Sequence, residues 1–262
     1  MMFAKETDIE QIREVAKGLL WLDPNDMLVP SVGMTMHPYF DFPVTAYKDE
    51  NGELKMVQIF GIEENRQEEY RHNLENVCNY ISGTIDKSNL TEIFMKVRQP
   101  YHFALLKFSM PYMTKEDFDK WLGDTWVSSE NPNQDANVSI SEFIEWFSEA
   151  DKTTMMNDDE LEYYNKLPDI VEVYRGVAVG RAESEGLSWT CNFETAEWFA
   201  NRFNTEEQLG YIIKGKIKKE NVFAYFNRRN EDEILCNSDE IYDVERVHTA
   251  PKKKNHSQVI SK

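Results

Sequence analysis

VEVYRGV, residues 171–177, opens the stretch that decides the fold, which continues through GLSWTCNFETAEWFANRF (186–203) and YIIKGKIKKENVFAYFNRRNEDEIL (211–235). β-Branched and aromatic residues alternate with polar residues in VEVYRGV and in both halves of the last segment. That period of two is typical of strands with one buried face. The stretch therefore predicts at least three strands, and the pattern before residue 170 is different.

The strand pattern continues to the end of this region, with one helix inside it. EDEILC (231–236) and DVERVH (243–248) predict two further strands. Between the first and second strands, apolar residues recur at i, i+3, i+4 and i+7, which predicts a helix over 194–203. The residues of this apolar stripe are Ala196, Phe199, Ala200 and Phe203.

The chain before residue 170 has mainly helical patterns. PVTAYK (43–48) and ELKMVQIF (53–60) flank an Asn-Gly turn and predict a hairpin. The sequence therefore predicts an α+β fold, in which a helical and hairpin N-terminal region precedes a strand-rich core. Apolar spacing and helix caps predict helices over 8–20, 64–81 and 90–97, after Thr114, after Ser139 or Ser141, and before Pro168.

The polar loop SSENPNQDAN (128–137) is the candidate linker between domains. It predicts an N-terminal mixed region over 1–127 and a core with leading helices over 138–250. Residues 251–262, which include three consecutive lysines, are predicted to form a solvated tail.

The net charge of the chain limits the kinds of partner it can bind. Its 262 residues include 47 acidic and 29 basic residues, which give a formal net charge of −18. Such a field repels phosphate backbones, so passive binding to nucleic acid is not expected. A basic protein partner, or a small ligand held in a locally positive cleft, fits this charge better.

Neither a metal site nor a membrane segment is predicted. Cys78, Cys191 and Cys236 are widely spaced, and the five histidines form no paired-ligand motif. The first residues, MMFAKETDIEQIRE, lack the apolar region of a signal peptide. No run approaches the roughly 20 apolar residues of a membrane helix. We therefore expect a cytoplasmic protein.

Two carboxylates are the first chemical signal. If 231–236 is a strand, Glu231 and Glu233 lie on one face, roughly 6.8 Å apart along the strand. Paired carboxylates suit the cleavage of a glycosidic bond, where one stabilises an oxocarbenium-like centre and the other accepts a proton. The alternative is a solvated acidic turn after Arg228-Arg229-Asn230.

An arginine on the first predicted strand is the second signal. Arg175 shares a face with Val171, Val173 and Val177, so its guanidinium is expected at the edge of a buried surface. There it can bind a pyrophosphate or a ribose, and Gly176 lets a ligand or a neighbouring strand come close. The alternative is a structural ion pair.

A hydroxyl pair is the third signal. Ser188 and Thr190 share a face and can orient a carboxylate, while Trp189 packs behind them. The alternative is that both are ordinary strand hydroxyls and that Asn192 simply caps the following helix.

The remaining aromatic residues and the thiol in this stretch have a simpler interpretation. Cys191 is expected to be a small buried residue and not a nucleophile. Core positions are predicted for Trp198, Phe199, Phe203, Tyr225 and Phe226.

Taken in order, three motifs resemble the arginine–serine–glutamate class of mono-ADP-ribosyltransferases, which includes clostridial binary toxins and vertebrate ecto-enzymes. They are Tyr174-Arg175-Gly176, Ser188-Trp189-Thr190 with Ala196 and Phe199-Ala200 after it, and Glu231-Asp232-Glu233-Ile234-Leu235. The YRG, LSWT and AYFN pattern is also similar to that of small phage-encoded proteins. The resemblance covers Val171 to about Val247, and residues 1–170 resemble no family.

The resemblance implies a split-sheet transferase core with NAD⁺ as co-substrate and no metal. It implies that Arg175 holds a phosphate and the nicotinamide ribose, and that Ser188 positions Glu233. Glu233 would bond the ribose 2′-hydroxyl and stabilise the oxocarbenium ion, and Glu231 would steer or deprotonate an acceptor, typically an arginine. Gly176, Trp189 and Thr190 complete the implied NAD⁺ site, where Thr190 supports the strand edge.

The chain departs from the family pattern in two places. The middle of the family's Ser-Thr-Ser motif is the bulky Trp189, and its third position is Thr190. The segment between Phe203 and Tyr211 is short and leaves little room for a target-recognition loop.

Three functions therefore stay open. The first is transfer of ADP-ribose to a macromolecule, such as a host protein in a conflict between phage and bacterium. The second is an NAD⁺ glycohydrolase on the same fold. The third is an inactive acidic binding protein, such as an inhibitor that mimics nucleic acid. The charge favours the third, whereas the ordered motifs favour the first two.

Overall fold

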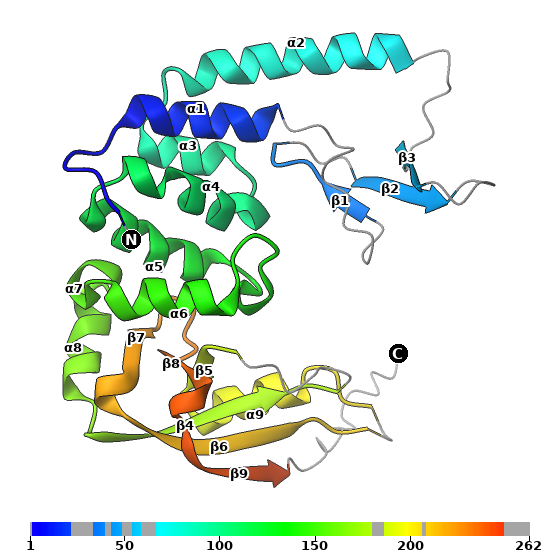
Figure 1. Cartoon of the computed structure of the whole chain (residues 1–262). Helices are drawn as coiled ribbons and strands as arrows, with labels where there is room; N and C mark the ends of the chain where they lie inside the picture. Colours follow the sequence, from blue (N-terminus) through cyan, green and yellow to red (C-terminus); the bar gives the residue numbers. More distant parts are fainter. Residues whose placement is uncertain are drawn as a thin grey trace, which may run out of the picture. The chain divides into compact units, whose positions relative to one another are not determined.

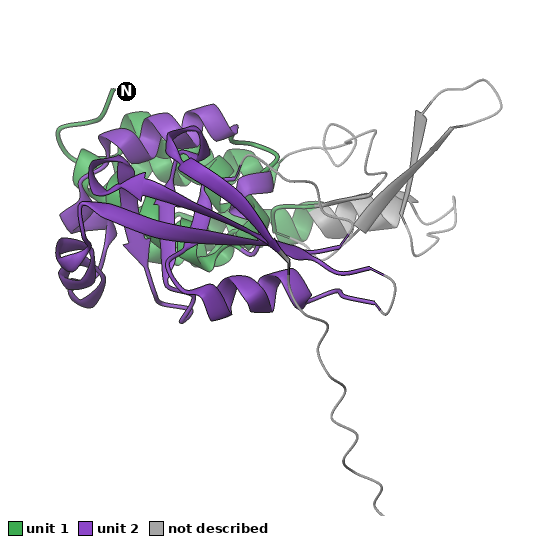
Figure 2. Cartoon of the chain, turned by 90° about the horizontal axis from the view of Figure 1, so that it is seen from below, with its two compact units in different colours: residues 1–129, 135–138 green, residues 130–134, 139–262 purple. Residues whose placement is uncertain are grey.

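The computed structural model describes residues 2–21, 34–39, 43–48, 54–58, 67–179, 186–205 and 208–248 (Figure 1). The chain divides into two compact units, coloured separately in Figure 2. The first unit comprises residues 1–129 and 135–138, and the second comprises residues 130–134 and 139–262. Helices are followed by a six-stranded antiparallel sheet, which confirms the predicted α+β class.

The first unit is built from helices and a small sheet. The sheet has the order β1-β2-β3, and the antiparallel pair β2 and β3 confirms the predicted hairpin, whose turn lies outside the described residues. The strands are β1 (Met34–Met36), β2 (Pro43–Lys48) and β3 (Leu54–Gln58). The helices are α1 (Ile9–Leu20), α2 (Gln67–Ile85), α3 (Leu90–Lys96), α4 (His102–Ser109) and α5 (Lys115–Ser128), with 3₁₀ turns η2 (Gln99–Tyr101) and η3 (Met110–Tyr112).

Local capping sets where these helices begin. The Asp8 side chain accepts from the backbone N–H of Gln11 at the start of α1, and Thr114 caps α5 as the sequence predicts. The predicted helix over 64–81 is α2, which continues to Ile85. Apolar side chains that are less than 2% exposed fill the interior of the unit: Ile12, Phe94, Phe103, Leu105, Phe118 and Trp126.

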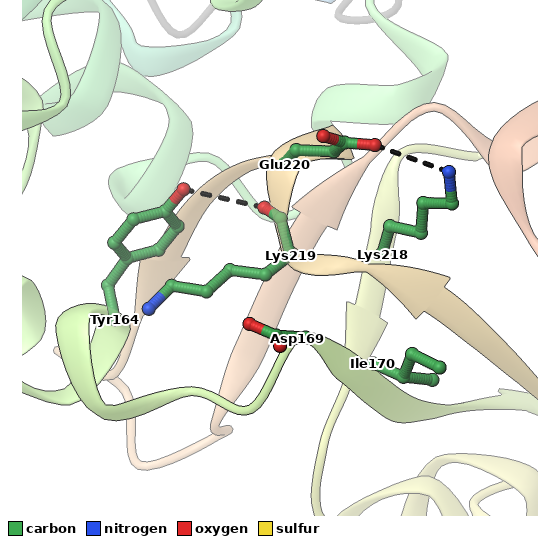
Figure 3. Close-up of a pocket in the computed structure, with 6 residues that line it drawn as sticks. All are labelled: Tyr164, Asp169, Ile170, Lys218, Lys219 and Glu220. Carbon is green, nitrogen blue, oxygen red and sulfur yellow. Dashed lines mark hydrogen bonds and ion pairs between the residues drawn. The ribbon is translucent and has the colours of Figure 1, made fainter.

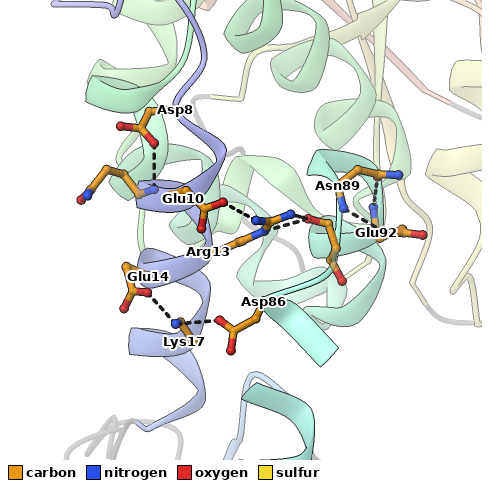
Figure 4. A network of polar contacts seen from close by, with 10 residues as sticks. Asp8, Glu10, Arg13, Glu14, Lys17, Asp86, Asn89 and Glu92 are labelled. Carbon is orange, nitrogen blue, oxygen red and sulfur yellow. Dashed lines mark hydrogen bonds and ion pairs between the residues drawn. The ribbon is translucent and has the colours of Figure 1, made fainter. Parts of the chain in front are cut away.

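A polar network joins α1 to the turn after α2 (Figure 4). Arg13 donates from Nε and Nη2 to the Ser88 carbonyl, at 3.0 and 2.8 Å. Lys17 lies between Glu14 and Asp86, at 2.5 and 2.8 Å. Exposed ion pairs of this kind contribute about 0–1 kcal/mol each, so the apolar packing beneath them is the larger stabilising effect.

The second unit contains the strand-rich region. Its sheet has the order β7-β8-β5-β4-β6-β9, and all neighbouring strands are antiparallel. The strands are β4 (Ile170–Val177), β5 (Ser188–Thr190), β6 (Tyr211–Lys218), β7 (Val222–Phe226), β8 (Glu233–Cys236) and β9 (Tyr242–His248). The helices are α6 (Ile140–Glu149), α7 (Lys152–Met155), α8 (Asp158–Lys166) and α9 (Phe193–Asn201), with η4 (Pro132–Gln134), η5 (Lys219–Asn221) and η6 (Ser238–Glu240). Ser139 is the residue that caps α6.

The sheet has few backbone pairings at its centre, between β4 and β5, and we call this junction the seam. β4 pairs with β6 along its whole length, from Ile170 opposite Lys218 to Val177 opposite Tyr211. In contrast, β4 is joined to β5 through a single residue pair, Tyr174 opposite Thr190. The sheet therefore consists of two three-stranded halves that meet at this pair, next to the predicted site.

Helix α9 packs directly on β4 and β6, and its small residues allow this. Ala196 and Ala200 are fully buried and form a cluster with Ile212 of β6. The core prediction is wrong for Trp198 and Phe203, each 51% exposed, because α9 ends at Asn201 and turns only its alanine face to the sheet. Phe199 is half-buried.

The strand aromatics follow the prediction: Tyr225 and Phe226 are both buried. None of the helices in the described part of the chain has both the length and the apolar composition that crossing a membrane requires.

Candidate active site

The strand predicted over 231–236 is wrong at its start. β8 begins at Glu233, and Glu231 lies in the turn before it. Asn230 and Asp232 have φ values of 57° and 47°, in the left-handed region that ends a regular strand. The two glutamates are therefore not aligned by strand alternation, and other contacts bring them together.

Ser188 holds Glu233 as the sequence predicts. β5 and β8 pair so that Thr190 lies opposite Glu233 and Ser188 lies opposite Leu235. From this diagonal position the Ser188 hydroxyl donates to Glu233 Oε1 at 2.5 Å. Glu233 is only 3% exposed, and a hydrogen bond to a buried carboxylate is stronger than one between neutral groups. The Glu233 carboxylate is therefore fixed at one edge of the seam.

Arg175 reaches the same serine from β4. Its Nη1 donates to the Ser188 carbonyl at 3.1 Å, and its guanidinium carbon lies 6.0 Å from the centre of the Trp189 ring. Burial lowers the pKa of the guanidinium, which nevertheless stays charged because arginine has so high an intrinsic pKa. Ser188 thus links Arg175 and Glu233, through its carbonyl on one side and its hydroxyl on the other.

Gly186 leaves the space that the guanidinium fills. A Cβ atom at Gly186 would lie 2.3 Å from both Nη1 and Nη2 of Arg175. No side chain fits there unless the guanidinium moves. The backbone before β5 is therefore shaped around Arg175, although nothing in the local sequence pattern singles out Gly186.

Thr190 and Trp189 hold the two sides of β5. The Thr190 hydroxyl donates to the backbone carbonyl of Glu231 at 2.7 Å, and so holds the turn that precedes β8. Trp189 is 7% exposed, and its indole N–H donates to the Ser238 hydroxyl at 3.2 Å. Trp189 therefore packs behind the hydroxyl pair.

Arg229 is the functional candidate that sequence reasoning missed. Its Nη2 lies 2.9 Å from Glu231 Oε2 and 3.9 Å from Glu233 Oε2. It is this cation that brings the two carboxylates together. The neighbouring Arg228 instead pairs with buried Glu160 at 3.3 Å. An Arg-Arg pair just before two glutamates was the available signal, but the sequence does not say which arginine turns toward them.

Gly176 contributes indirectly. The sequence predicts a ligand or a strand beside it, and in the structure helix α9 is the element that comes close. A Cβ atom at Gly176 would lie 2.1 Å from the Ala196 carbonyl oxygen and 2.6 Å from the Ala200 nitrogen. Gly176 therefore seats α9 against the strand that carries Arg175.

The thiols near the site are not activated. Cys191 is half-buried, and burial is the main cause that raises its pKa. Burial also raises the pKa of Cys236 to about 12. Both thiols are protonated at neutral pH, so neither is available as a thiolate nucleophile.

The site residues do not line the pocket found in the second unit at the start of β4 and the end of β6. That pocket, of about 520 Å³, is lined by six residues that surround the ends of β4 and β6 (Figure 3). Its lining residues are Tyr164, Asp169, Ile170, Lys218, Lys219 and Glu220. Chemistry and geometry, and not cavity volume, identify the candidate site. Among the described residues, no group of three or more His, Cys, Asp or Glu side chains is arranged to hold a metal ion.

Together these residues offer two guanidinium groups, a hydroxyl and two carboxylates, joined by the hydrogen bonds of Ser188 and the ion pairs of Arg229. This donor set suits a ligand with anionic phosphates and a sugar that becomes cationic. Comparison of the chain with protein-family models, curated proteins and solved structures found no match. The assignment of the site therefore depends on the contacts described above.

Proposed function

We propose that the chain is a mono-ADP-ribosyltransferase that transfers ADP-ribose from NAD⁺ to a protein acceptor. One observation carries the proposal: the Ser188 hydroxyl lies 2.5 Å from the carboxylate of buried Glu233, while Arg175 binds the carbonyl of the same serine. The negative net charge of −18 favours an acceptor with a basic surface. The cysteines Cys78, Cys191 and Cys236 are free thiols, in keeping with a reducing cytoplasm.

The first step breaks the bond between C1′ of the nicotinamide ribose and the ring nitrogen. The bonding electrons leave with nicotinamide, and positive charge develops on the ribose. The Glu233 carboxylate stabilises that charge, and its burial strengthens the interaction because water screens it less. Arg175 binds the anionic phosphate and holds the ribose against Glu233.

The second step joins the acceptor to C1′. The attacking atom of the acceptor forms the new bond, and its proton passes to the Glu231 carboxylate. The side chain of Glu231 is 28% exposed, compared with 4% for Glu233, so the acceptor can reach it. If water attacks instead, the same site acts as an NAD⁺ glycohydrolase.

The test is incubation of the purified chain with labelled NAD⁺, with and without bacterial lysate. We expect label on a macromolecule from the wild type. Glu231→Gln should reduce transfer about 100-fold and leave nicotinamide release within about threefold of wild type, because Glu231 acts only on the acceptor.

Glu220→Gln is the matched control, since it removes an exposed glutamate outside the site. Free nicotinamide without labelled product would favour the glycohydrolase. Absence of both signals, with no NAD⁺ binding by calorimetry, would leave the acidic binding protein as the better explanation.

A second prediction concerns Gly186. Gly186→Ala should weaken NAD⁺ binding about tenfold, because the new methyl group displaces the Arg175 guanidinium. The melting temperature should change little, since only the end of a side chain has to move. Calorimetry of Gly186→Ala, Arg175→Ala and the double variant forms a cycle. If both act through the guanidinium, the double variant binds no worse than Arg175→Ala, whereas additive losses would contradict the explanation.

A further inference from the structure

The turn that carries both glutamates has an unfavourable backbone. Asn230 and Asp232, on either side of Glu231, have φ values of 57° and 47°. A left-handed conformation is unfavourable for an L-residue, and asparagine and aspartate tolerate it better than most. This conformation persists only if other contacts stabilise it. The contacts are concentrated on Asp232.

Asp232 uses its side chain and its backbone to fix the turn. One carboxylate oxygen accepts from the Tyr225 hydroxyl at 2.7 Å, and the other accepts from the Asn192 amide at 2.9 Å. Its N–H donates to Asn227 Oδ1, and its carbonyl accepts from the Cys191 N–H, both at 3.1 Å. The Cys191 thiol also donates to this carbonyl, at 3.6 Å, so five hydrogen bonds meet on the residue between the two glutamates.

The partners of Asp232 are themselves held in place. Tyr225 is 2% exposed on β7, and its ring stacks on Tyr163 of α8 at 4.1 Å. The Asn192 side chain oxygen accepts from the N–H of Glu194 and caps α9, so its amide group cannot turn over. The Asn227 N–H donates to Glu160, which is 2% exposed. The turn is thus attached to α8, α9 and β7.

We infer that Asp232 is a positioning residue, which holds Glu231 and Glu233 in the geometry that the reaction needs. Glu233 begins β8 directly after Asp232, and the carbonyl of Glu231 directly before it accepts from Thr190. A rotation of the turn would move both carboxylates together. In the proposed reaction Asp232 contacts neither C1′ of the ribose nor the attacking atom of the acceptor. It acts through the positions of Glu231 and Glu233. This inference rests on the function proposed above.

The test compares Asp232→Ala with Asp232→Asn. Alanine removes both side-chain acceptors and disfavours the left-handed backbone, so kcat for nicotinamide release should fall at least about tenfold. KM for NAD⁺ should change less than about threefold, because Arg175 and Ser188 are untouched. Asparagine keeps the backbone preference and can accept from Asn192 while it donates to the Tyr225 oxygen. It should restore kcat to within about threefold of wild type.

Asp243→Ala is the matched control. Asp243 is an exposed aspartate on the edge strand β9 with a φ value of 52°, and it pairs with Lys216 of β6. Asp243→Ala also removes an aspartate from a left-handed position, but it should leave kcat unchanged because Asp243 lies outside the site.

Amide hydrogen exchange separates this inference from the proposed function. In Asp232→Ala, exchange over residues 227–233 should become at least about tenfold faster, and in Asp243→Ala it should not change there. Unchanged exchange, or faster exchange with a wild-type kcat, would overturn the positioning role. A wild-type chain without NAD⁺ turnover would overturn the proposed function, and exchange alone would then decide whether Asp232 fixes the turn.

Discussion

Glu233→Gln is expected to lower nicotinamide release from NAD⁺ by about 10³-fold and to leave the fold intact. The carboxylate supplies the negative charge that faces the developing oxocarbenium-like centre, and a preorganised group of this kind contributes two to three orders of magnitude. Glutamine has the same shape and can still accept from the Ser188 hydroxyl, which lies 2.5 Å from Glu233 Oε1. The measurement is the rate of nicotinamide release, with thermal melting as the check on folding.

Glu233→Asp provides the complementary control. It keeps the charge but withdraws it by one methylene group, so part of the activity should remain. Glu231→Gln should keep nicotinamide release, because that residue acts on the acceptor. If Glu233→Gln released nicotinamide at the wild-type rate, the Ser188–Glu233 pair would be a structural hydrogen bond, and the proposed function would lose its main support.

Gly176→Ala is expected to reduce the free energy of unfolding by about 3 kcal/mol or more. The added Cβ would lie 2.1 Å from the Ala196 carbonyl oxygen and 2.6 Å from the Ala200 nitrogen. Both are backbone atoms of α9, so no side-chain rotation relieves the overlap. The whole helix must move off β4, and overpacking of a rigid core is costly. Scanning calorimetry of the full chain would measure the loss.

Gly83→Ala is the control for the chemical change itself. Gly83 lies within α2, and a Cβ atom there meets no other atom within 4 Å. Alanine should therefore stabilise the helix by about 0.5–1 kcal/mol. Melting of Gly176→Ala at the wild-type temperature would show that α9 does not need its close approach to the strand.

Much of the fold could be predicted because its signals are local. Alternation of apolar and polar residues identifies β4, β6 and β7, and the small-residue stripe of Ala196 and Ala200 identifies the buried face of α9. Capping side chains indicate the starts of α5 and α6: Thr114 caps α5, and of the two candidates for α6, Ser139 and Ser141, the structure uses Ser139. Such patterns predict secondary structure because the periodicity of a strand or helix, and the capping of a helix, depend on residues close together in the sequence.

The errors fall where local pattern and tertiary structure disagree. EDEILC alternates like a strand, yet Asp232 adopts a left-handed conformation that Tyr225 and Asn192 stabilise from other elements. Trp198 and Phe203 look like core residues by composition, but α9 turns only its alanine face to the sheet. The residue type indicates whether a side chain tends to be buried, but tertiary packing decides whether it is buried in this fold.

By itself, the sequence determined the strands, the helix between them and the order of Arg175, Ser188 and Glu233. Only the tertiary structure decided which side chains these residues contact. Ser188 and Glu233 are 45 residues apart and meet because β5 lies next to β8 in the sheet. The order of strands depends on contacts between distant segments, which no local period encodes. The same holds for Arg229, which pairs with both Glu231 and Glu233 at a turn where Asn230 and Asp232 are left-handed.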